Sequence, residues 1–581
     1  FGSPGCMVNC PRGLDLFYSR RIGAAPQGAG LASSAGDYAD IPSNTTILGA
    51  AKLTGRTEGG TTVGVLDAVT GHETARVATA AGSTFTRPVA PLTNDFVGRV
   101  KQDLDEGNLV VGGLFTSVDR RLTDPGLAGL LPSSARAGGA DVRYYWGGHD
   151  YFFYAALTGS HVTGDSAAML RLQRSSARYL QRPDRSPTGD GLFTTAYDPG
   201  ATSMSGYGGI LRVAKQGGTW LWDINGSAVS PGFETNDLGF QRKADYLWLN
   251  GALARQLTTP TGWYRSLTYG GGVERYWNYE GDITQSDVTG AFILELLNYW
   301  QFKAIAQRSL AAYSDRLTRG GPVVRQPGQT MEQLEITSDP RQAVTLHAVG
   351  TLGQTDAGGF SRQLELTATW RPSPNVKVSL GPSYSHDVTT DQYVTSVADP
   401  TATDFYGRRY VFAHLDEKQL AMETRASITF TPSLSFELYV QPLIASAGFS
   451  SFEEFAAPRS EKKLVYGRDV GTIAPAGSGG SGAGTGGSGA SPEAYAIDPD
   501  GPGPAASFDL PNPNFDRRSL RGTAVLRWQW RPGSTAYLVW TQTRNGRAPF
   551  GDLSLNRDLG ALGSLPADNT LEVKISYWLG F

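Results

Sequence analysis

The final stretch of the chain, Leu571 to Phe581, most constrains its fold, because apolar and polar side chains alternate along it. Side chains at every second position of a strand share a face. One set comprises Glu572, Lys574, Ser576 and Gly580, with Trp578 as its large apolar exception. The other set comprises Leu571, Val573, Ile575, Tyr577, Leu579 and Phe581. We therefore expect a terminal strand with one apolar face and one mostly polar face.

The chain ends on an aromatic residue, Phe581. A last strand with apolar residues at alternate positions and a terminal Phe resembles the insertion signal of bacterial outer-membrane β-barrels. Ile575, Tyr577, Leu579 and Phe581 carry that signal, which implies outer-membrane lipid and the barrel-assembly machinery as partners. A half-buried edge strand of a soluble protein alternates in the same way, so the rest of the chain must decide.

Composition restricts how this chain could span a membrane. Its 73 Gly, 25 Tyr and 12 Trp are typical of tight turns and aromatic girdles, and only 18% of its residues are charged. The most apolar run, residues 291–306, is interrupted by polar and charged side chains, and a membrane helix needs about 20 apolar residues. A spanning form must therefore be a closed β-barrel, because lipid offers no partner to an open sheet edge. The formal charge of −3 predicts no nucleic-acid partner.

The amino-terminal residues 1–44 are rich in Gly, Pro, Ala and Ser and lack sustained alternation. We expect either a plug segment in the barrel or a linker from a periplasmic domain, and we favour the plug. Cys6 and Cys10 predict a local disulfide formed in an oxidising compartment. The sequence opens without Met or a signal peptide, so we expect a secretory signal, or a whole upstream domain, before it.

From residue 45 onward, alternating stretches are separated by turn residues, which predicts about 24 strands, roughly 22 to 26, in residues 45–581. The predicted strands are residues 45–57, 61–70, 73–80, 95–105, 108–118, 139–147, 150–160, 207–216, 219–229, 245–257, 263–277, 283–299, 301–313, 331–338, 342–353, 360–371, 375–386, 390–398, 405–414, 419–430, 434–447, 520–531, 534–545 and 571–581.

The lengths of the connections between these strands alternate. Counting back from Phe581, short connections rich in Pro or Gly occupy one set of positions, for example residues 531–534, 431–434 and 371–375. Long connections occupy the other set, among them residues 161–206 and 448–519, the latter with a Gly/Ser-rich stretch. Outer-membrane barrels have short periplasmic turns and long extracellular loops. This parity predicts that both termini are periplasmic.

We therefore predict an all-β protein, a transmembrane antiparallel β-barrel of the outer-membrane type. The alternative is a large soluble β-protein, whose apolar faces would need a second covering layer. The predicted strands leave no helical segments to form that layer, which favours lipid.

Charged side chains also alternate along the strands, and we assign one set to the lumen. They could form a salt-bridged wall or line a path for a polar solute. A barrel of about 24 strands is too wide for wall side chains to fill, so its lumen must hold water, a plug or a partner. The predicted lumen-facing residues are Glu365, Arg371, Lys377, Glu423, Arg425, Glu437, Arg527, Glu572 and Lys574.

Several segments resemble one uncharacterised family, the domain-of-unknown-function family 5916, across essentially the whole chain. They are residues 17–23 (FYSRRIG), 47–57 (ILGAAKLTGRT), 64–70 (GVLDAVT), 230–240 (SPGFETNDLGF) and 297–300 (LNYW). The resemblance implies an outer-membrane barrel that follows a periplasmic domain similar to carbohydrate-binding family 9 modules. It implies no catalytic residue, because the family has no established activity.

The residues themselves predict no catalytic group, metal site or cofactor: the six His are scattered, and no H-E-x-x-H or G-x-S-x-G motif occurs. Our first hypothesis is a gated or plugged channel for uptake of a polar solute or glycan. The second is an outer-membrane anchor or assembly scaffold for a periplasmic or surface protein. A surface hydrolase built by the long loops is a third and weaker hypothesis.

Overall fold

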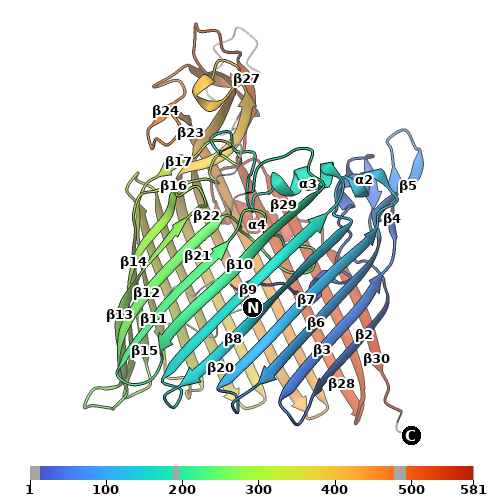
Figure 1. Cartoon of the computed structure of the whole chain (residues 1–581), viewed down its shortest axis with the longest axis vertical. Helices are drawn as coiled ribbons and strands as arrows, with labels where there is room; N and C mark the ends of the chain where they lie inside the picture. The colour runs from blue at the N-terminus through green and yellow to red at the C-terminus, as the bar shows by residue number, and fades with distance from the viewer. Residues whose placement is uncertain (1–12, 187–194, 477–491, 580–581) are drawn as a thin grey trace. The chain divides into compact units, whose positions relative to one another are not determined.

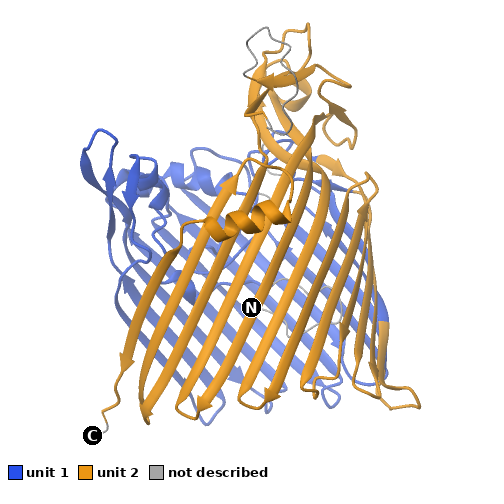
Figure 2. Cartoon of the chain, turned by 180° about the vertical axis from the view of Figure 1, so that it is seen from behind, with its two compact units in different colours: residues 1–256, 270–288, 312–323 blue, residues 257–269, 289–311, 324–581 orange. Residues whose placement is uncertain are grey.

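A computed structural model describes residues 13–186, 195–476 and 492–579. The chain divides into two compact units, which are described separately (Figure 2). Unit 1 comprises Phe1–Gln256, Gly270–Val288 and Ala312–Val323, and unit 2 comprises Leu257–Tyr269, Thr289–Ala311 and Val324–Phe581. Strands β13 (Tyr264–Trp277) and β14 (Ile283–Leu296) contribute residues to both units, whereas β16 (Ala312–Ser314) belongs to unit 1 and β17 (Val324–Gln326) to unit 2.

Unit 1 is built on an antiparallel sheet in which each strand pairs with the next strand of the sheet along the chain. Its strands are β2 (Ile47–Arg56), β3 (Thr61–Thr70), β6 (Leu92–Asp103), β7 (Leu109–Arg121), β8 (Ser134–Trp146), β9 (Tyr151–Thr163), β10 (Ser203–Lys215), β11 (Trp220–Val229) and β12 (Tyr246–Leu257).

The two ends of the unit 1 sheet differ. One end has short turns at residues 57–60, 104–108, 147–150 and 216–219, where Gly60, Gly107 and Gly218 supply the positive φ that tight turns require. The other end has long connections at residues 71–91, 122–133, 164–202 and 230–245. These hold helices α2 (Pro125–Ala128) and α3 (Ser166–Gln173), which are labelled in Figure 1.

A second, three-stranded sheet of unit 1 corrects one sequence prediction. Residues 73–80 were predicted as a strand of the main sheet, but β4 (Glu73–Ala78) pairs with β1 (Tyr38–Asp40) and β5 (Thr84–Ala90). Ala75, Val77 and Val89 are buried with Ala32 of helix α1 (Ala29–Ser33) in a separate small core. The alternation in this stretch therefore reflects burial in that core. The single-turn helix η1 (Ser19–Arg21) precedes α1 in the chain.

Unit 2 is also built on an antiparallel meander. Its strands are β15 (Gln301–Ser309), β18 (Gln329–Thr337), β19 (Val344–Thr355), β20 (Phe360–Ser373), β21 (Val376–Ala398), β22 (Arg408–Thr431), β23 (Leu434–Phe455), β28 (Phe515–Arg531), β29 (Ser534–Ala548) and β30 (Asp568–Ser576). Short turns at residues 374–375, 432–433 and 532–533 lie at one end, and residues 399–407, 456–514 and 549–567 connect the strands at the other.

Strands β21, β22 and β23 extend at the long-loop end of unit 2 and carry a small lobe (Figures 1 and 2). Val411, Phe452, Tyr466, Ile497 and Leu510 form its buried core. The lobe contains η2 (Thr403–Phe405), β24 (Lys463–Val465), β25 (Thr472–Ala476), β26 (Ala494–Asp498) and β27 (Phe508–Pro511). The bounds of the long loop predicted over 448–519 were therefore wrong, because β23 continues to Phe455 and β28 begins at Phe515.

Two predicted pairs of strands are in fact two single long strands. Residues 375–386 and 390–398 form β21, and residues 405–414 and 419–430 fall in β22. The register between β21 and β22 shifts at Thr389/Gln392 and at Tyr393/Thr395. Such irregularities interrupt the period of two without ending the strand, so the sequence looks broken where the backbone continues.

Each unit exposes one apolar face. In unit 2, Leu334 pairs with Gly350, which pairs with Leu364, so these residues project from the same side of the sheet. The large exposed residues of unit 2 with this orientation include Leu334, Leu346, Leu352, Leu364, Leu366, Leu380, Met422, Phe430, Leu538, Leu571, Val573 and Ile575. The equivalent residues of unit 1 include Leu53, Val100, Phe115, Leu157, Leu211, Ile224, Leu249 and Leu253.

Among the residues that the structure describes, no helix is long and apolar enough to cross a bilayer.

Candidate functional site

The opposite face of the unit 1 sheet carries buried polar side chains. Arg212 on β10 forms two hydrogen bonds with Asp223 on β11, Nε–Oδ1 at 2.9 Å and Nη2–Oδ2 at 2.7 Å, and both side chains are almost completely buried. Asn225 donates to Asp223 at 2.8 Å and to Asn250 at 3.3 Å. Trp248 Nε1 donates to Glu274 at 2.9 Å. Strand alternation brings these groups together, because residues that pair across strands share a face.

The first described residues of the chain cover part of this face. We call residues 13–23 the strap. Leu14 and Leu16 of the strap are buried in one cluster with Phe152, Ile210 and Trp248 of the sheet. The strap thus uses its alternate apolar side chains to pack onto aromatic and aliphatic residues of a face that is otherwise rich in hydrogen-bonding groups.

Residues 230–242 of the connection between β11 and β12, called the 230–242 connection below, hold the strap in place. Phe240 N donates to Asp15 O at 2.9 Å, and Tyr18 N donates to Leu238 O at 2.7 Å. Arg21 Nε donates to Gly239 O at 3.0 Å. A Cβ at position 239 would lie 2.1 Å from Asp15 O, so only glycine allows this approach of the two backbones. Two segments that carry the family resemblance, 17–23 and 230–240, are therefore bound to each other.

Buried ion pairs fix the 230–242 connection to the rest of unit 1. Glu234 accepts from Arg178 Nη2 at 2.5 Å, with side-chain exposures of 3% and 0%, respectively. Asp237 accepts from Arg120 at 2.5 Å. Glu234 N donates to Ser160 Oγ of β9 at 2.9 Å. Each charge has an opposite partner, as burial of a charge requires.

A pocket of about 340 Å³ lies beside the strap. Its lining combines apolar rings and side chains with the cations Arg242 and Lys243. The pocket is lined by Gly13, Leu14, Asp15, Val229, Phe233, Thr235, Phe240, Gln241, Arg242, Lys243 and Tyr246.

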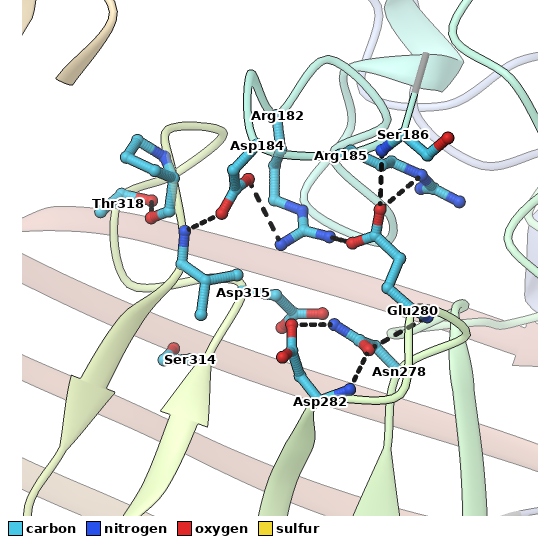
Figure 3. A network of polar contacts seen from close by, with 12 residues as sticks. Arg182, Asp184, Arg185, Ser186, Asn278, Glu280, Asp282, Ser314, Asp315 and Thr318 are labelled. Carbon is cyan, nitrogen blue, oxygen red and sulfur yellow. Dashed lines mark hydrogen bonds and ion pairs between the residues drawn. The ribbon is translucent and has the colours of Figure 1, made fainter. Parts of the chain in front are cut away.

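A network of charged groups joins the loops at the long-loop end of unit 1 (Figure 3). Arg182 is paired with Glu280 and lies 3.8 Å from Asp184, whose carboxylate accepts from Val323 N at 2.6 Å. Arg185 lies 3.5 Å from Asp245. Burial raises the pKa of Glu280, against the opposing effect of Arg182 and Arg185. The network connects residues 182–186, 245, 278–282 and 314–323, and thereby orders loops that the sequence places far apart.

The residues predicted as lumen-facing share the second face of the unit 2 sheet. Lys377 pairs with Ser427, which pairs with Glu437, and Arg425 pairs with Tyr439 in the same register. Arg425 forms an ion pair with Glu423 at 2.5 Å. Glu365, Arg371, Arg527, Glu572 and Lys574 have the same orientation as this set, opposite the exposed apolar residues. That this face lines a lumen stays a prediction.

The remaining predicted residues lie at the chain ends. Ile575 is exposed on β30, and Tyr577 and Leu579 follow the strand and are exposed. Cys6, Cys10 and Phe581 lie outside the described residues, so the disulfide and the terminal part of the insertion signal stay predictions.

The buried pairs of unit 1 were not predicted from the sequence. Asp223 gave a usable signal, because a carboxylate within the alternating run 220–229 (WLWDINGSAV) must find a partner on its face. Arg178 gave none, because it lies in a long connection without periodicity. Glu234 stood out only as part of the family-like segment 230–240.

The chain matches the family model described as "Domain of unknown function (DUF5916)" over residues 12–123 and 185–459. Among solved structures it is similar to Salmonella typhi OmpF in complex with daunomycin, with 10% identity, 67% of this chain and 92% of that chain covered, and a TM-score of 0.23. It is also similar to a mutant ferric enterobactin receptor from Pseudomonas aeruginosa in complex with enterobactin, with 10% identity, coverage of 84% and 76%, and a TM-score of 0.33. Both scores are low, so the fold assignment stands on this chain's own strands, register and exposure. No curated protein matches the sequence.

Proposed function

The chain is a member of the DUF5916 family, described only as a domain of unknown function, and we propose that it is a plugged outer-membrane β-barrel for passage of a polar solute. The observation that carries the proposal is the strap, a short segment bound to the polar face of a membrane-type sheet. We propose a glycan as the solute, because the family resemblance implies relatives that carry a sugar-binding-like domain.

Support for a membrane location comes from the exposed faces. A soluble protein rarely exposes so continuous an apolar surface, whereas lipid covers such a surface in a barrel. Aromatic residues gather near the short-turn end of each sheet: Tyr144, Trp146, Tyr151 and Trp220 in unit 1, and Trp370, Phe430, Trp528 and Tyr577 in unit 2. Such belts are typical of the boundary between a bilayer and water.

In this proposal the antiparallel strands close into one barrel, because an open edge in lipid would leave backbone groups without partners. The short turns and both chain ends face the periplasm, and the long loops and the lobe face the exterior. The membrane-facing residues contact outer-membrane lipid, and the barrel-assembly machinery inserts the chain through its last strand.

The strap is the plug of this barrel. It packs through Leu14 and Leu16, through the partly buried Phe17 and Ile22, and through hydrogen bonds from its backbone and from Arg21, all of which it must give up to leave the polar face. Its departure would uncover the sheet around Phe152, Ile210 and Trp248, on the face that also carries Arg212, Asp223 and Asn225, and polar groups of this kind can hydrogen-bond to a polar solute. The proposal therefore predicts that conductance depends on whether the strap is in place.

Planar bilayers test this proposal with two variants. Deletion of residues 1–44 should raise single-channel conductance several-fold above that of the intact chain. The second variant, Asp15→Cys with Phe240→Cys in a Cys6→Ser, Cys10→Ser background, should lock the strap when oxidised. The two residues form an antiparallel bridge, whose Cα separation of about 5.5 Å suits a disulfide.

The locked protein should stay closed until a reductant is added. The matched control is the Cys6→Ser, Cys10→Ser chain without the new cysteines, which should not respond to the reductant. Silence of both the intact and the deleted chain, each confirmed as folded and inserted, would contradict passage.

The lobe of unit 2 favours a second candidate, a scaffold for a surface partner. It has a core of its own and a three-stranded sheet formed by β25, β26 and β27. A scaffold needs no passage, so it predicts stable co-purification with another protein that is lost when residues 456–514 are replaced by a short linker. A channel alone predicts unchanged conductance and no such loss.

A further inference from the structure

Helix α4 (Leu555–Ser564), in the connection between β29 and β30, packs on the exposed apolar side of the unit 2 sheet. A Cβ at Gly546 would lie 2.6 Å from Leu565, the residue that ends the helix. Gly546 has the same orientation on β29 as the exposed Leu538 and Trp540. Figure 2 shows the helix, in orange, crossing in front of the strands of unit 2.

Charged groups fix the first turns of α4 to strand β28. Asp558 is completely buried and accepts from Arg518 Nη2 at 2.9 Å. Arg518 Nε also lies 2.8 Å from Asp516 Oδ1, which makes a second ion pair. Arg557 lies 3.4 Å from Asp516 and 2.7 Å from Asp558. The carboxylate of Asp558 further accepts from Ser554 N at 2.7 Å, the residue that caps the helix.

The end of α4 is fixed as well. Arg544 of β29 donates from Nη1 to Gly563 O at 2.6 Å and to Leu565 O at 3.1 Å. A cation at the carboxyl end of a helix binds its unpaired carbonyl groups and complements its dipole. Both ends of the helix are therefore bound to the outer side of the sheet by hydrogen bonds and ion pairs, which distinguishes α4 from a loose surface loop.

An apolar stripe remains exposed on this fixed helix. Leu562 is buried against the sheet, whereas Leu555 and Leu559 are 49% and 51% exposed. These residues follow helical spacing and form one continuous stripe. At about 100° per residue, Asn556 and Gly560 adjoin this stripe, whereas the exposed Ser564 lies about 140° around the helix from Leu559. Phe550, stacked under Arg557 at 4.4 Å, extends the exposed apolar surface.

The outer surface of β29 changes character just below the helix. Along its exposed side, Leu538 is followed by Trp540, Gln542 and Arg544. Trp540 Nε1 donates to Asn569 Oδ1 at 3.1 Å, so its ring lies beside apolar residues while its polar atom has a polar partner. This is the usual position of a Trp at the edge of a bilayer.

We propose that α4 is an interfacial helix, which rests on the outer-leaflet lipid at the bilayer edge with Leu555 and Leu559 inserted among the acyl chains. The inference rests on the proposed function, in which the apolar face contacts lipid. The lipid surface is the occupant because α4 is fixed by Arg544 to the outer side of β29, a few residues beyond Trp540, where that side changes from apolar to polar. An amphipathic helix with an apolar stripe of this kind lies in the plane of the interface.

Spin labels on single cysteines test the inference in the Cys6→Ser, Cys10→Ser chain, reconstituted in nanodiscs that hold one copy. The labelled positions are Leu559→Cys on the stripe, its matched control Ser564→Cys on the polar side of the same helix, and Leu538→Cys on the strand. Each variant is first checked for folding by heat-dependent gel mobility. The readout is the ratio of collision rates with oxygen, which concentrates in lipid, and with a nickel chelate, which stays in water.

The ratio at position 559 should exceed that at 564 several-fold and approach that at 538. Equal, water-like ratios at 559 and 564 with a lipid-like ratio at 538 would overturn the inference and leave the membrane location standing. A label at 559 shielded from both reagents would overturn it as well, since protein would then cover the stripe. A water-like ratio at 538 would overturn the proposed function and this inference together.

Discussion

At the scale of single residues, the interior of unit 1 depends on paired charges. Arg178 with Glu234, and Arg212 with Asp223, are buried almost completely, and each group has a partner in hydrogen-bonding distance. Desolvation of such a pair costs nearly as much as the attraction returns, so the pair adds little net stability. The pair instead holds its two segments in one conformation, because separating the partners would leave each charge buried without a counter-ion.

Glu234→Gln should therefore lower the free energy of unfolding by about 3 kcal/mol, since Arg178 would keep a buried charge without a counter-ion. The matched control is Asp119→Asn, which removes the partner of Arg136 from a pair whose side chains are 50% and 36% exposed. That change should cost less than about 1 kcal/mol. Urea unfolding in detergent micelles measures both, and equal losses would contradict the account of the buried pair.

Asp315 gives a pH-dependent prediction. Burial by itself raises the pKa of this carboxyl, but Arg316, Lys243 and Arg182 outweigh it and hold the pKa below its ordinary value of 3.8. A lowered folded-state pKa contributes stability that is present above 3.8 and is lost as pH falls through the folded value.

Asp315→Asn should thus destabilise the protein more at pH 7 than near pH 3, where the wild-type carboxyl has begun to lose its contribution. Urea unfolding of both proteins at the two pH values measures the difference. A loss of the same size at both values would show that the charge of Asp315 is not what stabilises these loops.

At the scale of elements, the sequence predicted strands well where the period of two is unbroken. The run 360–371 corresponds to β20, and 534–545 to β29. The prediction failed within β21 and β22. The register of β21 against β22 shifts near Thr389, and that of β22 against β23 shifts near Phe412. A bulge interrupts alternation in the sequence in the same way as a turn does. Helices α3 and α4 were missed because they are short and their stability comes from contacts that local sequence does not encode, such as Asp558 with Arg518.

The turn between β28 and β29 gives a prediction at this scale. Gly533 has φ of +77°, and a Cβ there would lie 2.6 Å from Cβ of Trp578. Gly358, in the turn between β19 and β20, has φ of +89° with open space around it. Alanine at 358 should cost about 1–2 kcal/mol for the left-handed backbone alone.

Gly533→Ala should cost about 1 kcal/mol more than Gly358→Ala, because the steric overlap with Trp578 adds to the same backbone strain. Thermal or urea unfolding of the two variants measures the difference. Equal costs would mean that the residues after β30 do not pack on this turn.

At the scale of the whole molecule, the alternation of apolar side chains and of connection lengths sufficed to predict an all-β, antiparallel architecture. The candidate site was beyond such reasoning. Its strap, Arg178 and the 230–242 connection meet only through the folding of long segments that have no periodicity. The family resemblance marked residues 17–23 and 230–240, and the structure shows that these two segments contact each other through Tyr18 and Leu238.

The central claim is that one sheet closes on itself, with lipid against the apolar set of side chains and water or the strap against the polar set. A density map of the protein in a lipid nanodisc tests it most directly. We expect β30 hydrogen-bonded to β2, lipid density against Leu364, Leu538 and Val573, and the strap on the inner wall. Unpaired edges at β2 and β30, or a layer of protein over those three side chains, would contradict the account.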